Sequence, residues 1–157
     1  MTRVRGSSTV VQYRVGRRGV PASRSFETWV DAALSARRGA ARQVNVLLFD
    51  EHEARALNRQ FRGKDYATNV LSFGYEEAQS RRGRAPRLLG DLVICAAVVA
   101  REARAQGNPV RDHFAHLTIH GVLHLLGFDH ETKRAASGME ALERRLLAGL
   151  GVPDPYS

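Results

Sequence analysis

The sequence predicts an α+β fold in one domain over residues 1–157, with a single mixed β-sheet of about four strands and about five helices. Three observations lead to this prediction. A length of 157 residues suits one domain whose core is large enough to fold without the support of disulfides or a structural metal. A content of 43% hydrophobic and 25% charged residues is typical of a globular chain. In the first part of the chain strand patterns alternate with helix patterns, and in the last part only helix patterns occur. This order favours α+β or a mixed α/β layer.

Four short segments have the pattern of strands. Residues 10–15 are rich in β-branched and aromatic side chains, and residues 43–49 alternate loosely between apolar and polar. Residues 69–73 and 88–94 are short apolar runs. Between these two runs, residues 76–86 are polar and arginine-rich, which predicts a loop.

The first two helices are indicated by apolar spacing and by the residues at their ends. Residues 25–38 place apolar side chains at helical spacing and are closed by Gly39. Asp50 is expected to cap a helix over residues 51–61, with Glu53 at the capping-box position.

Three further helices follow in the second half of the chain. Residues 96–106 are helical, and residues 133–149 form a final amphipathic helix. Pro109 suits the first turn of the helix between them, which runs to Leu126. Residues 151–155 contain one glycine and two prolines, so we expect a frayed tail.

The composition excludes several classes of protein. No apolar stretch approaches the roughly 18 residues of a membrane span, and no apolar signal region follows the arginine-rich start. That start also suits an organelle transit peptide, but residues 10–15 fit a strand better, so we expect a cytoplasmic protein. The single cysteine, Cys95, excludes an internal disulfide framework and a cysteine-rich zinc module, and we expect it in the core.

The charge of the chain suits a polyanionic partner. The formal net charge is +8, and 22 of the 24 basic residues are arginines. Because arginine binds phosphate bidentately, RNA would fit this charge. A genome that encodes arginine wherever a cation is needed explains the composition equally well.

Residues 114–126 are apolar nearly throughout, which predicts a buried helix. His116, His120 and His124 are set into it at four-residue spacing and therefore share one face. Burying a polar group without a partner costs about 1–3 kcal/mol, so three such groups need partners in common. For His116 we weigh a proton shuttle against a core histidine bonded to the backbone, and favour the second.

The pattern His120-x3-His124-x2-Gly127-x2-His130 predicts a metal site. The first two imidazoles converge on one ion, and the glycine turn brings the third to it. Three imidazoles leave a fourth position open, as in catalytic zinc sites, so we expect one Zn²⁺ per chain. The spacing equals that of metzincin proteases, but Gly121 stands where those enzymes have their glutamate base.

The eleven residues HGVLHLLGFDH at 120–130 resemble the signature of the YbeY family. LNRQFRGKD at 57–65 with TNVLSF at 68–73, and LGDLVI at 89–94, are similar to two further blocks of that family. The resemblance implies a single-domain zinc endoribonuclease of ribosomal RNA maturation, including the 3′ end of 16S RNA, and of ribosome quality control. It also implies a zincin-like sheet covered by helices, with a cleft over the metal.

The resemblance further implies a functional arginine at Arg62, which would bind the scissile phosphate or its developing charge. The alternative for Arg62 is an ordinary solvated surface charge. Arg59, Lys64 and the arginines of residues 81–87 are candidates to follow the RNA backbone.

Two aspartates have open roles. Asp129 either orients a ligand imidazole through a hydrogen bond or caps the turn before His130. Asp91 lies in a predicted buried strand, where a helix cap or a salt bridge is as plausible as a catalytic role.

Taken together, these features predict a zinc-dependent, single-strand-specific endoribonuclease whose partners are ribosomal RNA and ribosomal subunits, with no membrane partner. A zincin-like metalloprotease is one alternative, supported by the ligand spacing and opposed by Gly121. A non-catalytic, ribosome-associated factor whose zinc only holds the fold is another. The general base is unassigned, because either water activated at the metal or the RNA 2′-hydroxyl could be the nucleophile.

Overall fold

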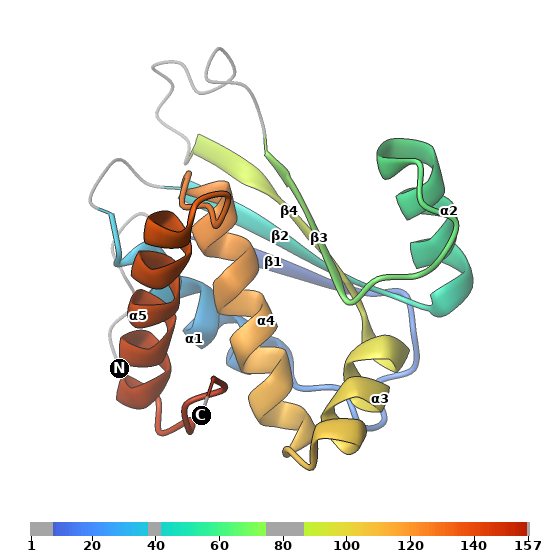
Figure 1. The fold of residues 1–157 in the computed structure, drawn as a ribbon. Coiled ribbons are helices and arrows are strands. Elements are labelled where there is room, and N and C mark those ends of the chain that lie inside the picture. The colour runs from blue at the N-terminus through green and yellow to red at the C-terminus, as the bar shows by residue number, and fades with distance from the viewer. Residues whose placement is uncertain (1–7, 38–41, 75–86, 157) are drawn as a thin grey trace.

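The computed structural model describes residues 8–37, 42–74 and 87–156 (Figure 1). The predicted α+β class is confirmed, and the predicted loop over residues 76–86 and Gly39 lie outside the described residues. The elements, in chain order, are β1 (Ser8–Tyr13), α1 (Ser23–Leu34), β2 (Arg42–Phe49), α2 (Glu51–Arg62), β3 (Val70–Gly74), β4 (Arg87–Cys95), α3 (Ala96–Gln106), α4 (Val110–Leu125) and α5 (Lys133–Gly149).

The four strands form one mixed sheet in the order β1-β2-β4-β3. β1, β2 and β4 are parallel, and β3 runs antiparallel to β4 at one edge, with Ser72 opposite Leu92. Successive side chains of a strand point to opposite faces. Accordingly, the Ser72 hydroxyl reaches α4, where it donates to the Gly121 carbonyl at 3.2 Å, while the Phe73 ring contacts α2.

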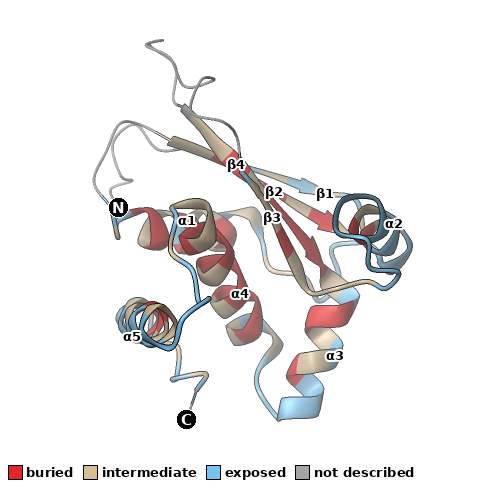
Figure 2. Cartoon of the chain, turned by 45° about the horizontal axis from the view of Figure 1, so that its top comes forward, coloured by how far each residue is buried: buried red, intermediate tan, exposed pale blue. Residues whose placement is uncertain are grey.

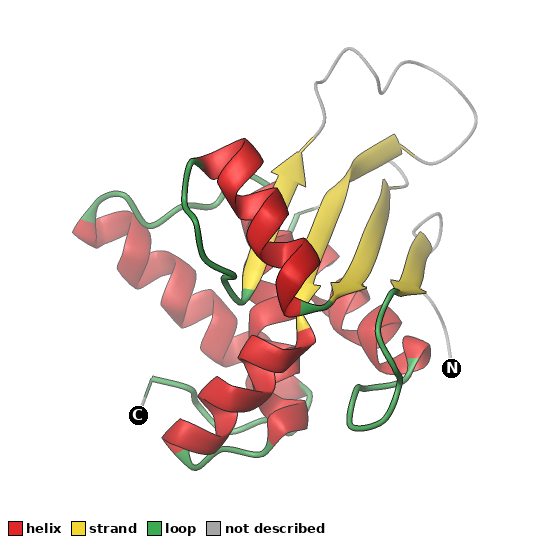
Figure 3. Cartoon of the chain, turned by 90° about the vertical axis from the view of Figure 1, so that its right-hand side faces the viewer, coloured by secondary structure: helices red, strands yellow, loops and turns green. Residues whose placement is uncertain are grey.

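The sheet separates α2 from the other helices that pack on it. α1, α4 and α5 lie on one side of the sheet and α2 lies on the other (Figure 1). Figure 3 looks from the side of α2 and shows the sheet between α2 and the helices behind it. α3 continues directly from β4 and packs against α4. Strand β3 therefore has α4 near one face and the end of α2 near the other.

α4 is the central helix of the core, as its apolar sequence predicts. Phe114, Ile119, Val122 and Leu123 are almost fully buried, and Figure 2 shows buried positions along the length of the helix. Phe26 of α1 packs edge-on against Phe114, with the ring centroids 6.0 Å apart. Because the sheet, α1, α3 and α5 surround α4, the helix is apolar on nearly every side.

The ends of α2 and α4 follow from residues that the sequence identifies. The Asp50 carboxylate accepts the Glu53 backbone N–H at 2.8 Å, and Gly63 ends α2 with a φ of 70°. Pro109 stands just before α4 rather than in its first turn, because its ψ of 136° is extended. After α4, Gly127 has a φ of 100°, which glycine adopts readily and which turns the chain toward the third histidine.

α1 ends at Leu34, so the predicted end at residue 38 is wrong. The Arg42 guanidinium explains the early end, because it donates to the Leu34 carbonyl at 3.1 Å and to the Arg37 carbonyl at 2.6 Å. These bonds satisfy carbonyl groups at the end of the helix without a further helical turn.

The single cysteine belongs to a second, smaller apolar cluster. Cys95 is fully buried, with Ala54 and Val98 beside it, as the sequence predicts. Burial raises the pKa of the Cys95 thiol, which keeps it an inert core side chain.

Candidate metal centre and the adjoining cleft

Three histidine side chains meet at the C-terminal end of α4. The Nε2 atoms of His120 and His124 lie 3.2 Å apart. The His130 ring lies 5.0 Å from the His124 ring and 5.8 Å from the His120 ring, measured between centroids. One ring nitrogen from each residue falls within 4.8 Å of the other two. The structure thus brings together the three residues that the spacing predicts.

The geometry of this group suits a metal ion bound by imidazole. Zinc–nitrogen bonds of about 2.0–2.1 Å at tetrahedral angles place two ligand nitrogens about 3.3 Å apart. The His120 and His124 nitrogens already have nearly this spacing. Burial, together with the neighbouring His120 and His130, lowers the pKa of His124, so its imidazole is neutral, as a metal ligand must be.

A buried glutamate fixes the orientation of His120. The Nδ1–H of His120 donates to Oε2 of Glu143 at 2.5 Å, which leaves the lone pair of Nε2 directed at the other histidines. Glu143 comes from α5 and is fully buried. A carboxylate behind a ligand imidazole is the usual arrangement that holds the ring and its tautomer.

Glu143 is the centre of a small polar network. His116 Nε2 lies 3.1 Å from Oε1 of Glu143, and the Tyr156 hydroxyl donates to the same oxygen. Burial would raise the pKa of Glu143, but hydrogen bonds from His116, His120 and Tyr156 outweigh it and lower the pKa to about 2. Burial raises the pKa of Tyr156, and the hydrogen bond to Glu143 raises it further. A buried carboxylate anion therefore lies against the rings of His116 and His120.

This network changes two expectations from the sequence. His116 bonds to the side chains of Glu143 and Tyr156 rather than to the backbone as expected, because α5 packs against α4 and brings its carboxylate to this ring. The tail is not frayed: Asp154 accepts from Arg144 at 3.2 Å and from the Tyr156 backbone N–H at 2.8 Å. These bonds hold the Tyr156 hydroxyl beside His116 and Glu143.

A cavity of about 600 Å³ opens in front of the histidines, between β3 and α4. His116, His120 and His124 line its α4 wall, and Ser72 lies on its β3 wall. Arg62 stands at the rim. The described lining residues include no aspartate or glutamate, so the cavity surface is neutral to positive.

Arg62 is the last residue of α2 rather than a loop residue, since the helix continues one residue past its predicted end. Its Nη2 donates to the Ser72 carbonyl at 3.1 Å, and its guanidinium carbon lies 4.8 Å from the centre of the Phe73 ring. These two contacts hold the charge at the cavity that contains His120 and His124. Of the backbone-tracking candidates, Arg59 and Lys64 are exposed near this end of α2. Residues 81–86 lie outside the described residues.

The two aspartates make local contacts. Asp129 is exposed, and its Oδ1 accepts the Glu131 backbone N–H at 3.1 Å, which is the turn-capping contact. Asp91 accepts from the Asn45 amide at 2.9 Å, and the two residues are partners in the register of β2 and β4.

Gly121 lies where α4 packs closely against the sheet. A Cβ atom at this position would lie 2.7 Å from Leu92 Cδ2 and 3.3 Å from Ser72 Oγ. The position at which a metzincin carries its glutamate base is therefore pressed against β4 and faces away from open space. A glutamate could not occupy it without displacing the side chains of the sheet.

Glu143 and Tyr156 are the site residues that the sequence reasoning missed. For Glu143 a signal was present, because it stands four residues from both Met139 and Leu147, which are buried on the same stripe of α5. A charged residue in the middle of such a stripe needs a buried polar partner. Tyr156 carries no such pattern, since it follows a proline-rich tail.

The fold and the site define an α+β protein with a three-histidine group that could hold a metal ion. Two of these histidines, His120 and His124, line an open cleft whose described lining residues include no acid. Sequence comparison then gives the family. The model of the family described as endoribonuclease YbeY matches residues 17–151, and the chain belongs to this family. Its membership places the protein among the nucleases, which are hydrolases.

Individual relatives agree. The endoribonuclease YbeY of Alkalilimnicola ehrlichii is 55% identical over 149 residues, which are 93% of this chain and 89% of the relative. That of Xanthomonas campestris is 55% identical over 94% of this chain and 91% of its own length. The solution structure of TM1509 from Thermotoga maritima is similar with a TM-score of 0.57 and 25% identity, over 91% of each chain. Among the described residues, no helix combines the length and apolarity needed to cross a membrane.

Proposed function

We propose that this chain is a zinc-dependent, single-strand-specific endoribonuclease. As one domain in the cytoplasm, it would act in ribosomal RNA maturation, including the 3′ end of 16S RNA, and in ribosome quality control. One observation carries the proposal: the Arg62 guanidinium and the converging histidines His120 and His124 line the same cavity. Family membership supports the RNA substrate.

The donor set supports zinc as the ion. His120, His124 and His130 offer three imidazole nitrogen ligands and leave a coordination position open, which is the composition of catalytic rather than structural zinc sites. When bound, zinc would polarise a phosphate oxygen and lower the pKa of water. Glu143 serves this site by holding the His120 ring in the tautomer whose Nε2 can bind the ion.

Arg62 would bind the reacting phosphate. A guanidinium matches two phosphate oxygens at once, and its charge stabilises the negative charge that develops during cleavage. The Ser72 carbonyl and the Phe73 ring keep the group at the rim of the cavity before any substrate arrives, so little reorganisation is needed.

The shape and chemistry of the cavity support a single strand as substrate. The histidines lie at the foot of a recess between β3 and α4, which a flexible strand can enter more easily than a stiff A-form duplex. Since no described carboxylate lines the recess, the nucleophile is either water or the RNA 2′-hydroxyl. Analysis of the 3′ products separates the two, because only attack by the 2′-hydroxyl gives a cyclic phosphate.

The metalloprotease alternative has the ligand spacing in its favour. The packing of Gly121 against Leu92 opposes it, because the peptidase base has no room there. The alternative of a purely structural ion is opposed by the open cavity in front of the histidines and by the arginine at its rim.

The proposal is tested by mapping ribosomal RNA ends in cells depleted of this protein and supplied with variants. We expect depleted cells to accumulate 16S RNA with unprocessed 3′ ends. Wild-type protein should restore the processing, whereas His124→Ala and Arg62→Glu should not. Glu140→Gln, an exposed change on α5, should rescue like wild type. Normal RNA ends in depleted cells would overturn the role in ribosomal RNA maturation.

A further inference from the structure

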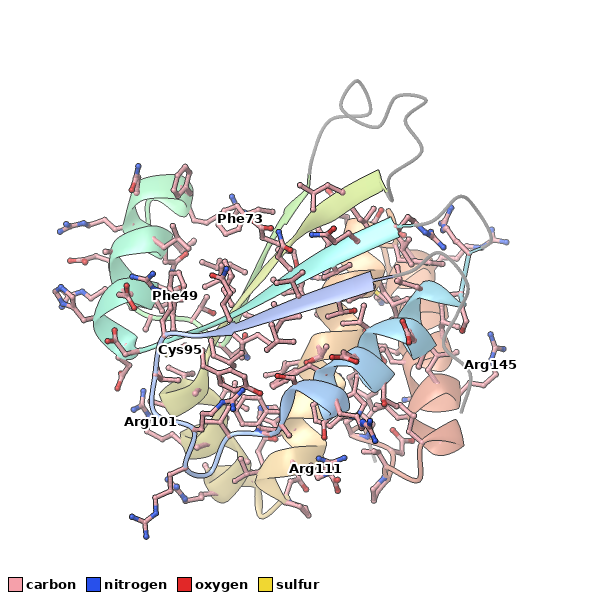
Figure 4. The ribbon with its side chains drawn as sticks, turned by 180° about the vertical axis from the view of Figure 1, so that it is seen from behind. Phe49, Phe73, Cys95, Arg101, Arg111 and Arg145 are labelled. Atoms are coloured by element: carbon pink, nitrogen blue, oxygen red, sulfur yellow. The ribbon has the colours of Figure 1, made fainter. Side chains whose placement is uncertain are left out.

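Two phenylalanines form a pair on the side of β3 that faces away from the cavity. The rings of Phe61 in α2 and Phe73 in β3 meet edge-on, with centroids 5.6 Å apart and an angle of 71° between their planes. Figure 4 shows Phe73 on the side of the sheet where α2 lies. Phe73 is partly buried, whereas 53% of Phe61 is exposed, although it lies in the last turn of a helix whose other exposed residues are mostly polar.

Arg62 joins this aromatic pair to the candidate active site. Its guanidinium lies over the Phe73 ring at 4.8 Å and donates to the backbone of β3, and Arg62 also lines the cavity that contains His120 and His124. A ligand whose phosphate binds Arg62 from the cavity side therefore has the exposed ring of Phe61 within reach across the edge of β3.

The charge around the pair suits a polyanion. Arg59, Arg62 and Lys64 surround Phe61 in the sequence, and none of them forms an ion pair with a carboxylate among the residues that the structure describes. The acidic residues of this region are engaged elsewhere: Glu51 pairs with Arg101, Glu53 with Arg14 and Asp65 with Arg55. The end of α2 thus combines an aromatic ring with cations that form no salt bridge to a described carboxylate.

We propose that Phe61, supported by Phe73, is a stacking platform for an unpaired nucleobase of the RNA strand whose phosphodiester lies at Arg62. The inference rests on the proposed ribonuclease function and adds a second recognition element to it. Single-stranded nucleic acids are commonly bound by cationic grooves in which bases stack on aromatic side chains. A base inside a duplex has both faces covered by its neighbours, so this platform also selects single strands.

The test measures the affinity of the full-length protein for a short single-stranded RNA by fluorescence anisotropy. Phe61→Leu keeps an apolar side chain but removes the aromatic face, and should weaken binding roughly tenfold or more. Phe61→Tyr should restore binding to within about threefold, because it restores the ring. The matched control is Tyr66→Leu, since Tyr66 is 54% exposed but lines a different cavity beside Glu51 and Asp65. Its affinity should stay at the wild-type value.

An abasic nucleotide moved stepwise along the RNA completes a double-mutant cycle. At one position it should weaken wild-type binding as much as Phe61→Leu does, with no further loss when both changes are combined. If wild type cleaves RNA and Phe61→Leu binds like Tyr66→Leu, or loses affinity equally for every abasic RNA, the platform is wrong and the ribonuclease function stands. If wild type neither binds nor cleaves RNA, both proposals fall.

Discussion

Replacing Glu143 by glutamine should weaken both the fold and the metal site. The substitution keeps the volume of the buried side chain but removes its charge. In the native protein the carboxylate accepts hydrogen bonds from His116, His120 and Tyr156, and water does not reach it. An amide offers one oxygen to these three donors and turns an N–H group toward at least one of them.

The expected loss of stability is about 3 kcal/mol, whether it is counted from the three hydrogen bonds or from the pKa that they lower. Hydrogen bonds to a charged group are worth about 1 kcal/mol more than neutral ones, and three are weakened. A pKa lowered from 4.5 to about 2 corresponds to about 3 kcal/mol in favour of the folded state at neutral pH. For a chain of this length, that loss lowers the thermal midpoint by about 6–12 °C.

The sign of the pH dependence follows from the same values. The pKa of Glu143 is lower in the folded state, so its contribution is present above pH 4.5 and is lost as the pH falls toward 2. The difference in unfolding free energy between metal-free wild type and Glu143→Gln should therefore shrink over this range. Zinc affinity at neutral pH should fall roughly 10–100-fold, because the His120 ring loses its fixed orientation.

The assay is chemical denaturation and zinc titration of the metal-free proteins, with Glu140→Gln as control. Glu140 lies one turn earlier on α5, its side chain is 41% exposed, and Arg144 is 3.9 Å away, so its change should stay within about 0.5 kcal/mol. If Glu143→Gln matched Glu140→Gln in both stability and zinc affinity, the reasoning about the buried network would be refuted.

Four further outcomes are expected. His124→Ala should lose most of its zinc, because two imidazoles cannot complete the site, and full zinc content by elemental analysis would contradict this. Zinc titrations should show the ion still bound somewhat below pH 6.5 and released in stronger acid, because burial and neighbouring histidines lower the pKa of His124. Release of zinc well above pH 6.5 would count against His124 as a ligand. Arg62→Glu should keep zinc and thermal midpoint but cleave single-stranded RNA roughly 10²-fold more slowly, with Arg62→Lys intermediate, whereas wild-type cleavage would make Arg62 a surface charge. Gly121→Glu should lower the thermal midpoint by displacing Leu92 and should not create casein cleavage, which, if it appeared, would revive the protease alternative.

Local patterns explain how much of the fold the sequence predicts. The nine described elements each have a local mark: a periodicity, a short apolar run, or a cap such as Asp50 before α2 or the left-handed Gly63 after it. Strand order carries no such local mark. β4 lies between β2 and β3 because of tertiary packing, and neither its length nor its apolar run names its partners. The end of α1 depends likewise on Arg42, which lies at the start of β2 and donates to the Leu34 carbonyl.

The same distinction holds for the site. His120 and His124 share a helix face at four-residue spacing, and Gly127 signals the turn to His130, so local geometry alone predicts that they converge. The contact of Arg62 with the cavity forms only when α2 ends beside β3. Glu143 lies 23 residues after His120 and reaches it only because α5 packs back on α4. Such contacts cannot be read from spacing.

The central claim is that a metal held by the three histidines is needed to cut single-stranded RNA. It is tested most directly by assaying the purified protein after chelation, and again after zinc is restored, on a single-stranded RNA and its duplex. The protein without its metal should stay folded but should not cleave RNA. Zinc should restore cleavage of the single strand in wild type and not in His124→Ala, and the duplex should stay intact. Undiminished cleavage by the metal-free protein, or its unfolding when the metal is removed, would contradict a catalytic role for the metal.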